Sequence, residues 1–309
     1  MNSSVIRLKE HLMKADLHIH SLHSNDGEFS IPDIIEKCHA CGLDTFSITD
    51  HNSVTGSIEA ESLTAIHGGM NFIPGIEIDC NYRGTDLHLL GYQVDLRSED
   101  FKALEGSVRQ QHMDAIPKMI GNLKKLGIDV DQGELMEVSE GEPPSGELIA
   151  EQLLKNRAQH SNPLLLPYLP GGERSDMPLI NFYLDFFAQG KPAYVKIEHL
   201  DFGDAIALVR DNGGIPMVAH PGLNLQGREE AAGELLDQGA AGLEVFNNYH
   251  NKEQVAFFAE LTLQRGALMS CGSDFHGRNK PLISLGHYRL LESYLVYLEK
   301  CLIKIQNVV

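Results

Sequence analysis

Basic residues are scarce in this sequence relative to acidic ones. Lys and Arg total 25 of 309 residues, Asp and Glu total 43, and the formal net charge is -18. Such a surface repels the phosphate backbone of nucleic acids, so we expect no long nucleic acid as a partner. A local cationic site, including one made by bound metal ions, could still hold a small anion.

Long apolar runs are absent as well. No segment approaches the roughly 18 apolar residues of a membrane helix, and residues 1–20 lack the apolar core of a signal peptide. Hydrophobic residues make up 42% of the chain, enough for one large α/β domain or a domain with an insertion. We therefore expect a cytoplasmic protein without membrane contact, and the sequence leaves its oligomeric state open.

Cysteine is also rare, with five residues in the chain. Cys38 and Cys41 form a C-x-x-C pair, which could be redox-active or zinc-binding. No second C-x-x-C completes a zinc site. Ile31, Ile34 and Ile35 share helical spacing with the two cysteines, which places the pair near the buried face of an amphipathic helix. We interpret both cysteines as core residues.

Short apolar or alternating segments recur along the chain and predict strands. Seven of them begin near residues 15, 44, 71, 86, 214, 242 and 267. Helical patterns follow several, and strand–helix alternation is typical of a mostly parallel sheet or barrel. Strand signals are sparse between residues 97 and 190, where three helical patterns occur. We interpret 97–190 as a mainly helical insertion, with residues 1–96 and 191–309 forming the α/β part.

Histidine is unusually abundant, with 15 residues that are concentrated in particular segments. His18 and His20 alternate with apolar residues, so they share one face of a strand. Further acidic and imidazole side chains lie in or just after later predicted strands: His51, Glu77, His88, His220, Asp274 and His276. Functional groups of parallel α/β folds collect at the carboxyl ends of strands. Each residue alone could be structural, but together they predict a multinuclear site for zinc, manganese or iron.

The motifs that carry these residues resemble the PHP family, named for polymerase and histidinol phosphatase. They are "DLHIHS", "DG", "TDHN", "GIEI", "HLLGY", "AHPG" and "GSDFHG", in that order. The resemblance covers roughly residues 14–96 and 191–290. It implies a distorted seven-stranded β/α barrel that hydrolyses phosphate esters with up to three metal ions. The subgroup most similar to this chain carries a helical insertion after "HLLGY", rejoined here at Lys191–Val195.

The resemblance also implies which residues hold the ions. One ion would be held by His18, His20, Glu77 and Asp274, a second by Glu77, His88 and His220, and a third by Asp26, His51 and His276. Glu77 would thus bridge two ions. The segment "SNDG" is one residue longer than the family's usual spacing, so Asn25 and Asp26 both remain candidates. We choose Asp26 because Gly27 follows it and a carboxylate suits a hard ion.

Substrate-binding groups are less clearly indicated. His250 matches a family histidine that could contact substrate or protonate a leaving group, and could equally be a capping residue. Leu223 stands where relatives often carry an arginine, and Gly146 and Leu148 stand where they often carry an Arg-x-His segment. Possible replacements, each of which could be an ordinary surface residue, are Arg109, Lys196, His199 and Arg228.

The resulting hypothesis is a metal-dependent hydrolase of a phosphate ester on a small phosphorylated metabolite or nucleotide. A hydroxide shared by two metal ions would be the nucleophile, and Glu77 would organise it. The insertion would be a substrate lid. One alternative is a phosphodiesterase for a small cyclic phosphate or a short oligonucleotide end. Another is a non-catalytic PHP scaffold or metal-binding module, against which the complete ligand set argues.

Overall fold

The strands of this computed structural model, which describes residues 13–307, form two sheets. The first is parallel, in the order β1–β2–β3, and consists of β1 (Ala15–Ile19), β2 (Thr45–Ile48) and β3 (Asn71–Phe72). The second has the order β6–β4–β5–β7–β8–β9. Its strands are β4 (Gly75–Tyr82), β5 (Thr85–Tyr92), β6 (Leu200–Asp201), β7 (Ile215–Val218), β8 (Gly242–Phe246) and β9 (Leu268–Cys271).

Strand β5 departs from the expected strand–helix alternation. It runs antiparallel to both neighbours, β4 and β7, whereas the other pairings are parallel. The cause is a two-residue hairpin, because Arg83 and Gly84 both have positive φ, at 50° and 83°. Such a turn matches the twist of the flanking strands and leaves no room for a helix between them. The predicted α/β class is confirmed, with this one antiparallel strand.

The two sheets meet through single bridges. Ile19 at the end of β1 pairs with Phe275 after β9, and His51 after β2 pairs with Glu77 in β4. These contacts bring the carboxyl ends of β1 and β2 beside strands of the second sheet. Pro74 separates β3 from β4 within the segment that the sequence predicted as one strand, because proline cannot donate a ladder hydrogen bond.

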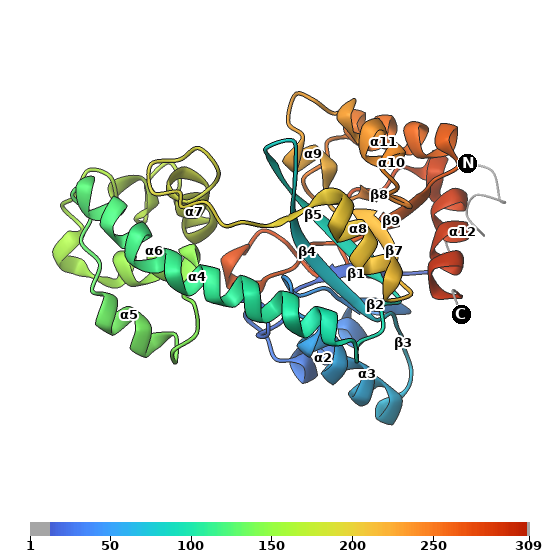
Figure 1. Ribbon diagram of the computed structural model, residues 1–309, viewed down its shortest axis with the longest axis horizontal. Helices are drawn as coiled ribbons and strands as arrows, with labels where there is room; N and C mark the ends of the chain where they lie inside the picture. Colours follow the sequence, from blue (N-terminus) through green and yellow to red (C-terminus); the bar gives the residue numbers. More distant parts are fainter. Residues whose placement is uncertain (1–12, 308–309) are drawn as a thin grey trace.

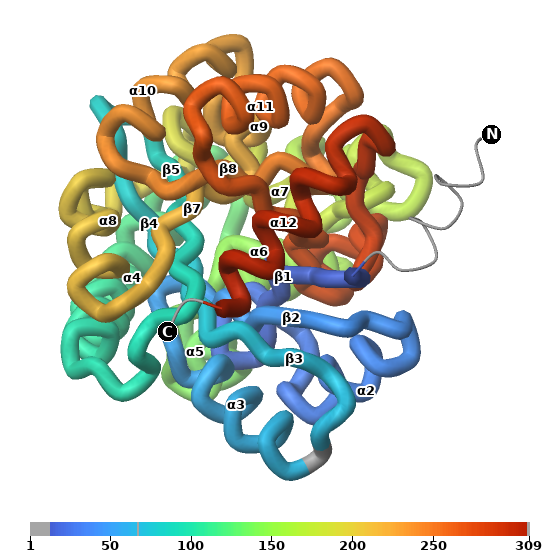
Figure 2. Tube along the Cα trace, turned by 90° about the vertical axis from the view of Figure 1, so that its right-hand side faces the viewer, coloured from blue at the N-terminus to red at the C-terminus, as the bar shows by residue number. Residues whose placement is uncertain are grey.

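Helices surround these strands (Figure 2). They are α2 (Ile31–Cys41), α3 (Thr55–His67), α8 (Phe202–Asp211), α9 (Pro221–Asn224), α10 (Ala231–Asp237), α11 (Lys252–Arg265) and α12 (Leu295–Gln306). With the two sheets they form what we call the main body. Short 3-10 turns cover Gly277–Asn279 and Glu292–Tyr294. A capping box of Asn251 and Gln254 starts α11, and Gly266 at φ 63° ends it.

Helix α2 forms where the sequence predicted it, but its cysteines separate. Ser30 caps the start, Gly42 at φ 68° ends it, and Cys38 is buried with the isoleucines of the same face. Cys41 in the last turn is exposed, so the interpretation of both cysteines as core residues was wrong for Cys41. Cys41 is the last residue of α2, directly before the Gly42 cap, whereas the buried side chains all lie earlier in the helix.

The segment between β5 and β6 forms a separate lobe (Figure 1). Its helices are α4 (Glu99–Lys125), α5 (Gln132–Val138), α6 (Gly146–Lys155) and α7 (Pro178–Phe186), with 3-10 turns at Arg157–Gln159 and Leu166–Tyr168. Helix α4 belongs to two cores. Phe101 and Leu104 pack with the main body, whereas Ile116 and Leu123 pack with the lobe's own core around Phe182. The lobe's independent packing thus begins near the middle of α4.

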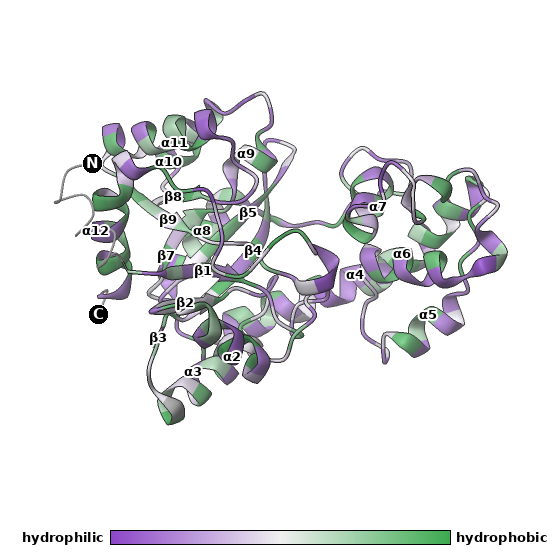
Figure 3. Ribbon diagram, turned by 180° about the vertical axis from the view of Figure 1, so that it is seen from behind, coloured by the Kyte–Doolittle hydropathy of each residue, from purple (hydrophilic) through white to green (hydrophobic). Residues whose placement is uncertain are grey.

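The hydropathy of the residues agrees with the position of the helices on the outside of the molecule. Figure 3 shows hydrophilic and hydrophobic residues alternating along the outer helices, as expected for helices with one buried face. Within residues 13–307, no helix is both long and apolar enough to cross a membrane.

Candidate metal centre

All nine predicted ligands come together where β1, β2, β7 and β9 end and β4 meets β5. We call them the ligand cluster. Their ligand atoms form groups within 4.8 Å: His18, His20, Glu77 and Asp274; Glu77, His88 and His220; and His20, Asp26, His51 and His276. The first two groups match the first two sites expected from the sequence, and the last contains the expected third site together with His20. Glu77 belongs to two groups, as its expected bridging position requires.

The backbone supports this convergence at strand ends. His220 after β7 and Asp274 after β9 both have positive φ, at 23° and 58°. Such conformations cost energy for residues other than glycine and are often kept at functional sites. They turn both side chains inward from their strand ends, beside the histidines of β1.

Two imidazoles are oriented by groups outside the cluster. His18 Nδ1 lies 3.0 Å from Glu244 Oε1, and His220 Nδ1 lies 2.6 Å from Asn224 Oδ1. Each ring therefore donates from Nδ1 and turns Nε2 inward, where both Nε2 atoms lie 3.1–3.2 Å from the Glu77 carboxylate. An outer acceptor that holds one nitrogen while the other faces inward is the usual arrangement of a metal-binding histidine.

The same arrangement recurs on the other side of the cluster. His51 Nδ1 lies 3.0 Å from Asp79 Oδ1, and Asp79 is itself held by the Asn52 side-chain amide at 2.8 Å. His276 Nδ1 lies 3.0 Å from the backbone oxygen of Asp274. Asp79 and Glu244 were not predicted as site residues. Asp79 follows Glu77 by two residues on the same strand face, and that spacing is the signal that could have found it.

Two buried atoms of the cluster lack a hydrogen-bond partner among the described residues. They are Glu77 Oε2 and His276 Nε2, and both residues are fully buried. Their nearest charged neighbours, His18 Nε2 at 3.1 Å and Asp26 Oδ2 at 3.0 Å, do not form hydrogen bonds with them. Buried polar atoms are nearly always satisfied, so each calls for a partner. A divalent cation would serve both, because a carboxylate oxygen and a neutral imidazole nitrogen are its ordinary ligands. The donor set therefore fits metal ions.

The ionisation of the carboxylates in the cluster also favours metal binding. Burial alone would raise the pKa of Glu77, but the imidazoles of His18, His51 and His88 hold it well below its usual range. Asp274 also has a strongly lowered pKa, with Lys280 as the largest cause opposing its burial. Both carboxylates are thus ionised near neutral pH and available to cations.

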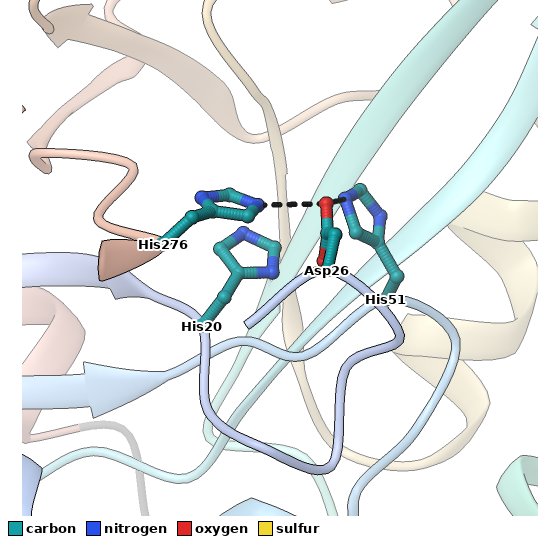
Figure 4. Close-up of side chains that lie close together, drawn as sticks. All are labelled: His20, Asp26, His51 and His276. Atoms are coloured by element: carbon teal, nitrogen blue, oxygen red, sulfur yellow. Dashed lines mark ion pairs between the residues drawn. The ribbon is translucent and has the colours of Figure 1, made fainter. Parts of the chain in front are cut away.

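The third group contains the aspartate whose assignment was open. Figure 4 shows the Asp26 carboxylate pointing between His51 and His276. Its Oδ2 lies 3.0 Å from His276 Nε2 and 3.7 Å from His51 Nε2. Asn25 is exposed. The structure therefore brings Asp26 to the imidazoles, in line with the choice made from the sequence.

The sequence profile of the PHP domain family matches residues 16–191 of this chain, more than half of its length. The chain belongs to the PHP domain family. The predicted family is thereby confirmed, and the histidine–carboxylate motifs that suggested it are the ones that the fold gathers at the strand ends.

Relatives of this PHP chain act on different phosphate esters. A 5'-3' exoribonuclease of Haemophilus influenzae is 28% identical, over 85% of this chain and 90% of its own. A 3',5'-nucleoside bisphosphate phosphatase of Chromobacterium violaceum is 26% identical, over 88% and 90%. A phosphoribosyl 1,2-cyclic phosphate 1,2-diphosphodiesterase of Eggerthella lenta is 26% identical, over 86% and 95%. These names agree on phosphate-ester chemistry and differ in substrate.

A solved structure supports the fold. An amidohydrolase from Chromobacterium violaceum, with bound sulfate and no metal, superimposes with a TM-score of 0.74 at 25% identity. The alignment covers 90% of this PHP chain and 92% of that one. The shared fold thus extends over both the main body and the lobe.

A cavity of about 380 Å³ lies between the ligand cluster and the lobe. His51, His88 and His220 form part of its wall on the main-body side, and α4, α6 and α7 contribute the other side. A substrate in this cavity would contact both parts of this PHP chain.

Two of the four predicted substrate-binding residues line this cavity. Arg109 does so from α4, where its guanidinium is held by Glu142 at 2.7 and 3.1 Å. His199 does so from the segment that returns to the main body, and its Nδ1 is buried without a hydrogen-bond partner among the described residues. Both residues thus stay candidates for substrate contact.

The other two lie outside the cavity. The Lys196 ammonium is exposed and pairs with Glu198 at 2.8 Å. Arg228 is exposed and donates to the Thr85 hydroxyl at 2.9 Å, on the outer side of the β4–β5 hairpin. Charge and position along the chain could not distinguish these two from Arg109, because the direction of a loop side chain depends on its neighbours in space.

His250 is not placed to act on a substrate. Its side chain is 1% exposed and absent from the cavity wall. Its Nδ1 lies 2.8 Å from the Val245 carbonyl, and its Nε2 accepts from the Gly222 backbone at 3.0 Å. Both nitrogens are used in connecting His250 to β8 and α9, so the suggested role in protonating a leaving group does not fit this geometry.

The charged residues of the cavity wall that were missed from the sequence include Lys280 and Glu147. The Lys280 ammonium lies 2.6 Å from Asp274 Oδ2, which also accepts from the Tyr249 hydroxyl at 2.6 Å. Glu147, in the first turn of α6, is 5% exposed, and burial together with the nearby Asp26 raises its pKa to about 7. Neither follows a strand directly, so no sequence pattern connects them with the ligand cluster.

Proposed function

We propose that this PHP chain is a metal-dependent phosphoesterase that hydrolyses the ester of a small phosphorylated metabolite or nucleotide. The observation that carries this proposal is the ligand cluster at the wall of a cavity of about 380 Å³. A cavity of this size accommodates a small metabolite. The three relatives support the reaction class, because each is named for the cleavage of a phosphate ester bond.

The ligand cluster would hold three divalent ions of manganese, iron or zinc in the three groups assigned from the sequence. Bound ions of this kind neutralise phosphoryl oxygens and lower the pKa of water towards neutrality, which supplies a nucleophile. Glu77 would connect two of the sites through its two carboxylate oxygens. His18, His51 and His220 would be held in the tautomer that leaves Nε2 free, through Glu244, Asp79 and Asn224 respectively.

Residues of the cavity wall would position the phosphate. Lys280 lies beside Asp274 and carries an ammonium group within the cavity. An ammonium there attracts a phosphoryl oxygen that approaches the ligand cluster. The lobe, which contains the predicted insertion 97–190, would act as a lid and exclude water from the bound ester, because it forms the opposite wall of the cavity. The Arg109–Glu142 pair ties α4 to the loop before α6 within that wall.

A phosphodiester substrate is the second candidate. The exoribonuclease and the cyclic-phosphate relative favour it, since both act on diesters. Because a relative acts on RNA, the exclusion of long nucleic acid from a net charge of -18 remains a prediction. A short oligonucleotide end or a small cyclic phosphate fits both this charge and the cavity.

A substrate panel tests the proposal. Protein loaded with manganese, iron or zinc is assayed with AMP, a pentose phosphate, a cyclic phosphate and a short RNA. We expect hydrolysis of at least one ester, with AMP not the best substrate, and at least ~10²-fold slower hydrolysis after chelation. Protein that binds three ions and cleaves none of these esters would instead be a non-catalytic PHP scaffold.

A further inference from the structure

We infer that Glu147 selects substrates whose leaving group carries hydroxyl groups, such as a sugar or polyol phosphate, and disfavours a second phosphate. This inference rests on the proposed phosphoesterase function and names the class of ester. The lobe contributes the Glu147 carboxylate, which lies within electrostatic range of Asp26 and Lys280 on the main body.

Glu147 is an unusual group for a buried position. It is 5% exposed, and no Lys or Arg within residues 13–307 forms an ion pair with it. Burial and the nearby Asp26 raise its pKa, and its own backbone N–H and Ser145 oppose this rise. A carboxylate has about four lone-pair sites, so acceptor capacity remains on the side that faces the cavity. Burying a carboxyl group with unused acceptor sites is costly, and a hydrogen-bond donor on the substrate would relieve that cost.

The backbone next to Glu147 leaves no room for a basic side chain. A Cβ at Gly146 would lie 2.7 Å from ring atoms of both Phe187 and Tyr183. The α7 rings thus occupy the space in which a longer residue at position 146 would have to lie. Glu147 is the neighbouring residue that reaches the cavity, so this turn of α6 presents a carboxylate rather than a cation.

The other charges of the cavity wall oppose a second anion. Arg109 and Lys280 are the only Lys or Arg side chains among the described residues of this wall, and each already pairs with a carboxylate. A second phosphate near α6 would meet Glu142 and Glu147 without a free cation. A second cation on the substrate is also disfavoured, because Lys280 and the proposed metal ions carry positive charge nearby. Neutral hydroxyl groups are repelled neither by these carboxylates nor by the positive charges, and they can donate a hydrogen bond to Glu147.

Apolar groups of the lobe would hold the remaining carbon skeleton. Ile180, Tyr183 and Phe187 line the cavity from α7 and its C-terminal end, and Ile116 and Met119 line it from α4. A leaving group with a carbon face and hydroxyl edges therefore matches both kinds of surface.

The test compares two esters with the same ring. Ribose 5-phosphate carries hydroxyl groups, whereas tetrahydrofurfuryl phosphate has the same ring and phosphate without them. With metal-loaded wild type, we expect kcat/KM for the ribose ester to be about 10- to 100-fold higher, as for a hydrogen bond to a charged group. Glu147→Ala should bring this ratio close to one, mainly through a higher KM for ribose 5-phosphate, because remote binding is largely uniform.

Control variants separate this role from a structural one. Glu151→Ala changes a carboxylate on the same helix that pairs with Lys155 and Arg278 outside the cavity, and it should leave the ratio unchanged. Glu147→Gln preserves shape and one acceptor, so it should give an intermediate ratio and remains informative if Glu147→Ala does not fold.

Opposite outcomes overturn the inference. The inference is wrong if the wild-type kcat/KM ratio of the two esters is near one, or if both Glu147 variants leave that ratio unchanged. It is also wrong if the wild type prefers adenosine 3',5'-bisphosphate to ribose 5-phosphate. Failure of the proposed function looks different, because metal-loaded wild type would then cleave none of these esters.

Discussion

At the residue scale, the ligand cluster depends on groups outside the nine predicted ligands. An imidazole has two nitrogens, and the partner of one decides whether the other carries a proton. Asp79, Glu244 and Asn224 each hold an Nδ1 and thereby leave an Nε2 available inside the cluster. The binding capacity of the predicted histidines is therefore set by residues that the motifs do not include.

Removal of Asp79 tests this dependence. Asp79→Ala leaves His51 Nδ1 without its acceptor, so the ring can change tautomer or rotate, and we expect about 10- to 100-fold weaker metal binding. Metal content measured by elemental analysis after dialysis against graded chelator gives the affinity. Asp79→Asn keeps an acceptor and should lose less, while the exposed Asp204→Ala should match wild type. Unchanged metal retention in Asp79→Ala would mean that His51 needs no such support.

At the element scale, the site depends on the close approach of β1 and the end of β9. Gly272 follows β9, and a Cβ there would overlap His18 Cβ and lie 2.6 Å from Glu244 Oε1. Both neighbours are fully buried and cannot move aside. Absence of a side chain at position 272 thus allows β1 to lie close to the end of β9, with His18 of β1 beside Glu244 of β8.

Alanine at two glycines should therefore have opposite effects. Gly272→Ala forces strand β1 away from β9, and we expect a loss of about 1–3 kcal/mol in the free energy of unfolding. Gly106→Ala in α4 meets nothing within 4 Å and should stabilise by roughly 0.5–1 kcal/mol, because alanine favours the helix. Thermal and urea unfolding measure both. Equal stability of Gly272→Ala and wild type would show that the strands have room to separate.

At the scale of the whole molecule, the main body and the lobe enclose the cavity while the net charge of the chain is -18. Three of the carboxylates, Asp26, Glu77 and Asp274, lie within the ligand cluster. Bound cations would compensate these buried charges and connect segments from β1 to the region after β9. Metal binding should therefore contribute to the stability of the entire main body.

Metal removal tests this coupling. A ligand that binds the native state at 100 times its Kd stabilises it by about 2.7 kcal/mol per site, so chelation should lower Tm by several degrees. Differential scanning calorimetry of loaded and chelated protein measures the shift. Glu77→Gln, which weakens two sites, should show a smaller difference between the two conditions. Coincident melting curves for loaded and chelated wild type would contradict the coupling.

The sequence by itself determined the family, the α/β class and the set of residues that gather in the cluster. Period-2 alternation placed His18 and His20 on one strand face, and positions at strand ends identified His220 and Asp274. These inferences succeed because strand geometry relates sequence spacing directly to direction in space. The helical character of residues 97–190 followed from local helical patterns in the same way, and Ser98, Asp131 and Ser145 cap three of the helices there.

Only the tertiary structure decided which other residues take part. Glu244 reaches His18 across 226 residues, and Glu147 meets the cavity because the lobe lies over the strand ends. His250 shows the reverse, because the Gly222 backbone, 28 residues away, uses the nitrogen that a catalytic role would need. The roles of such side chains depend on rotamers and partners from distant segments, and one-dimensional spacing carries no information about either.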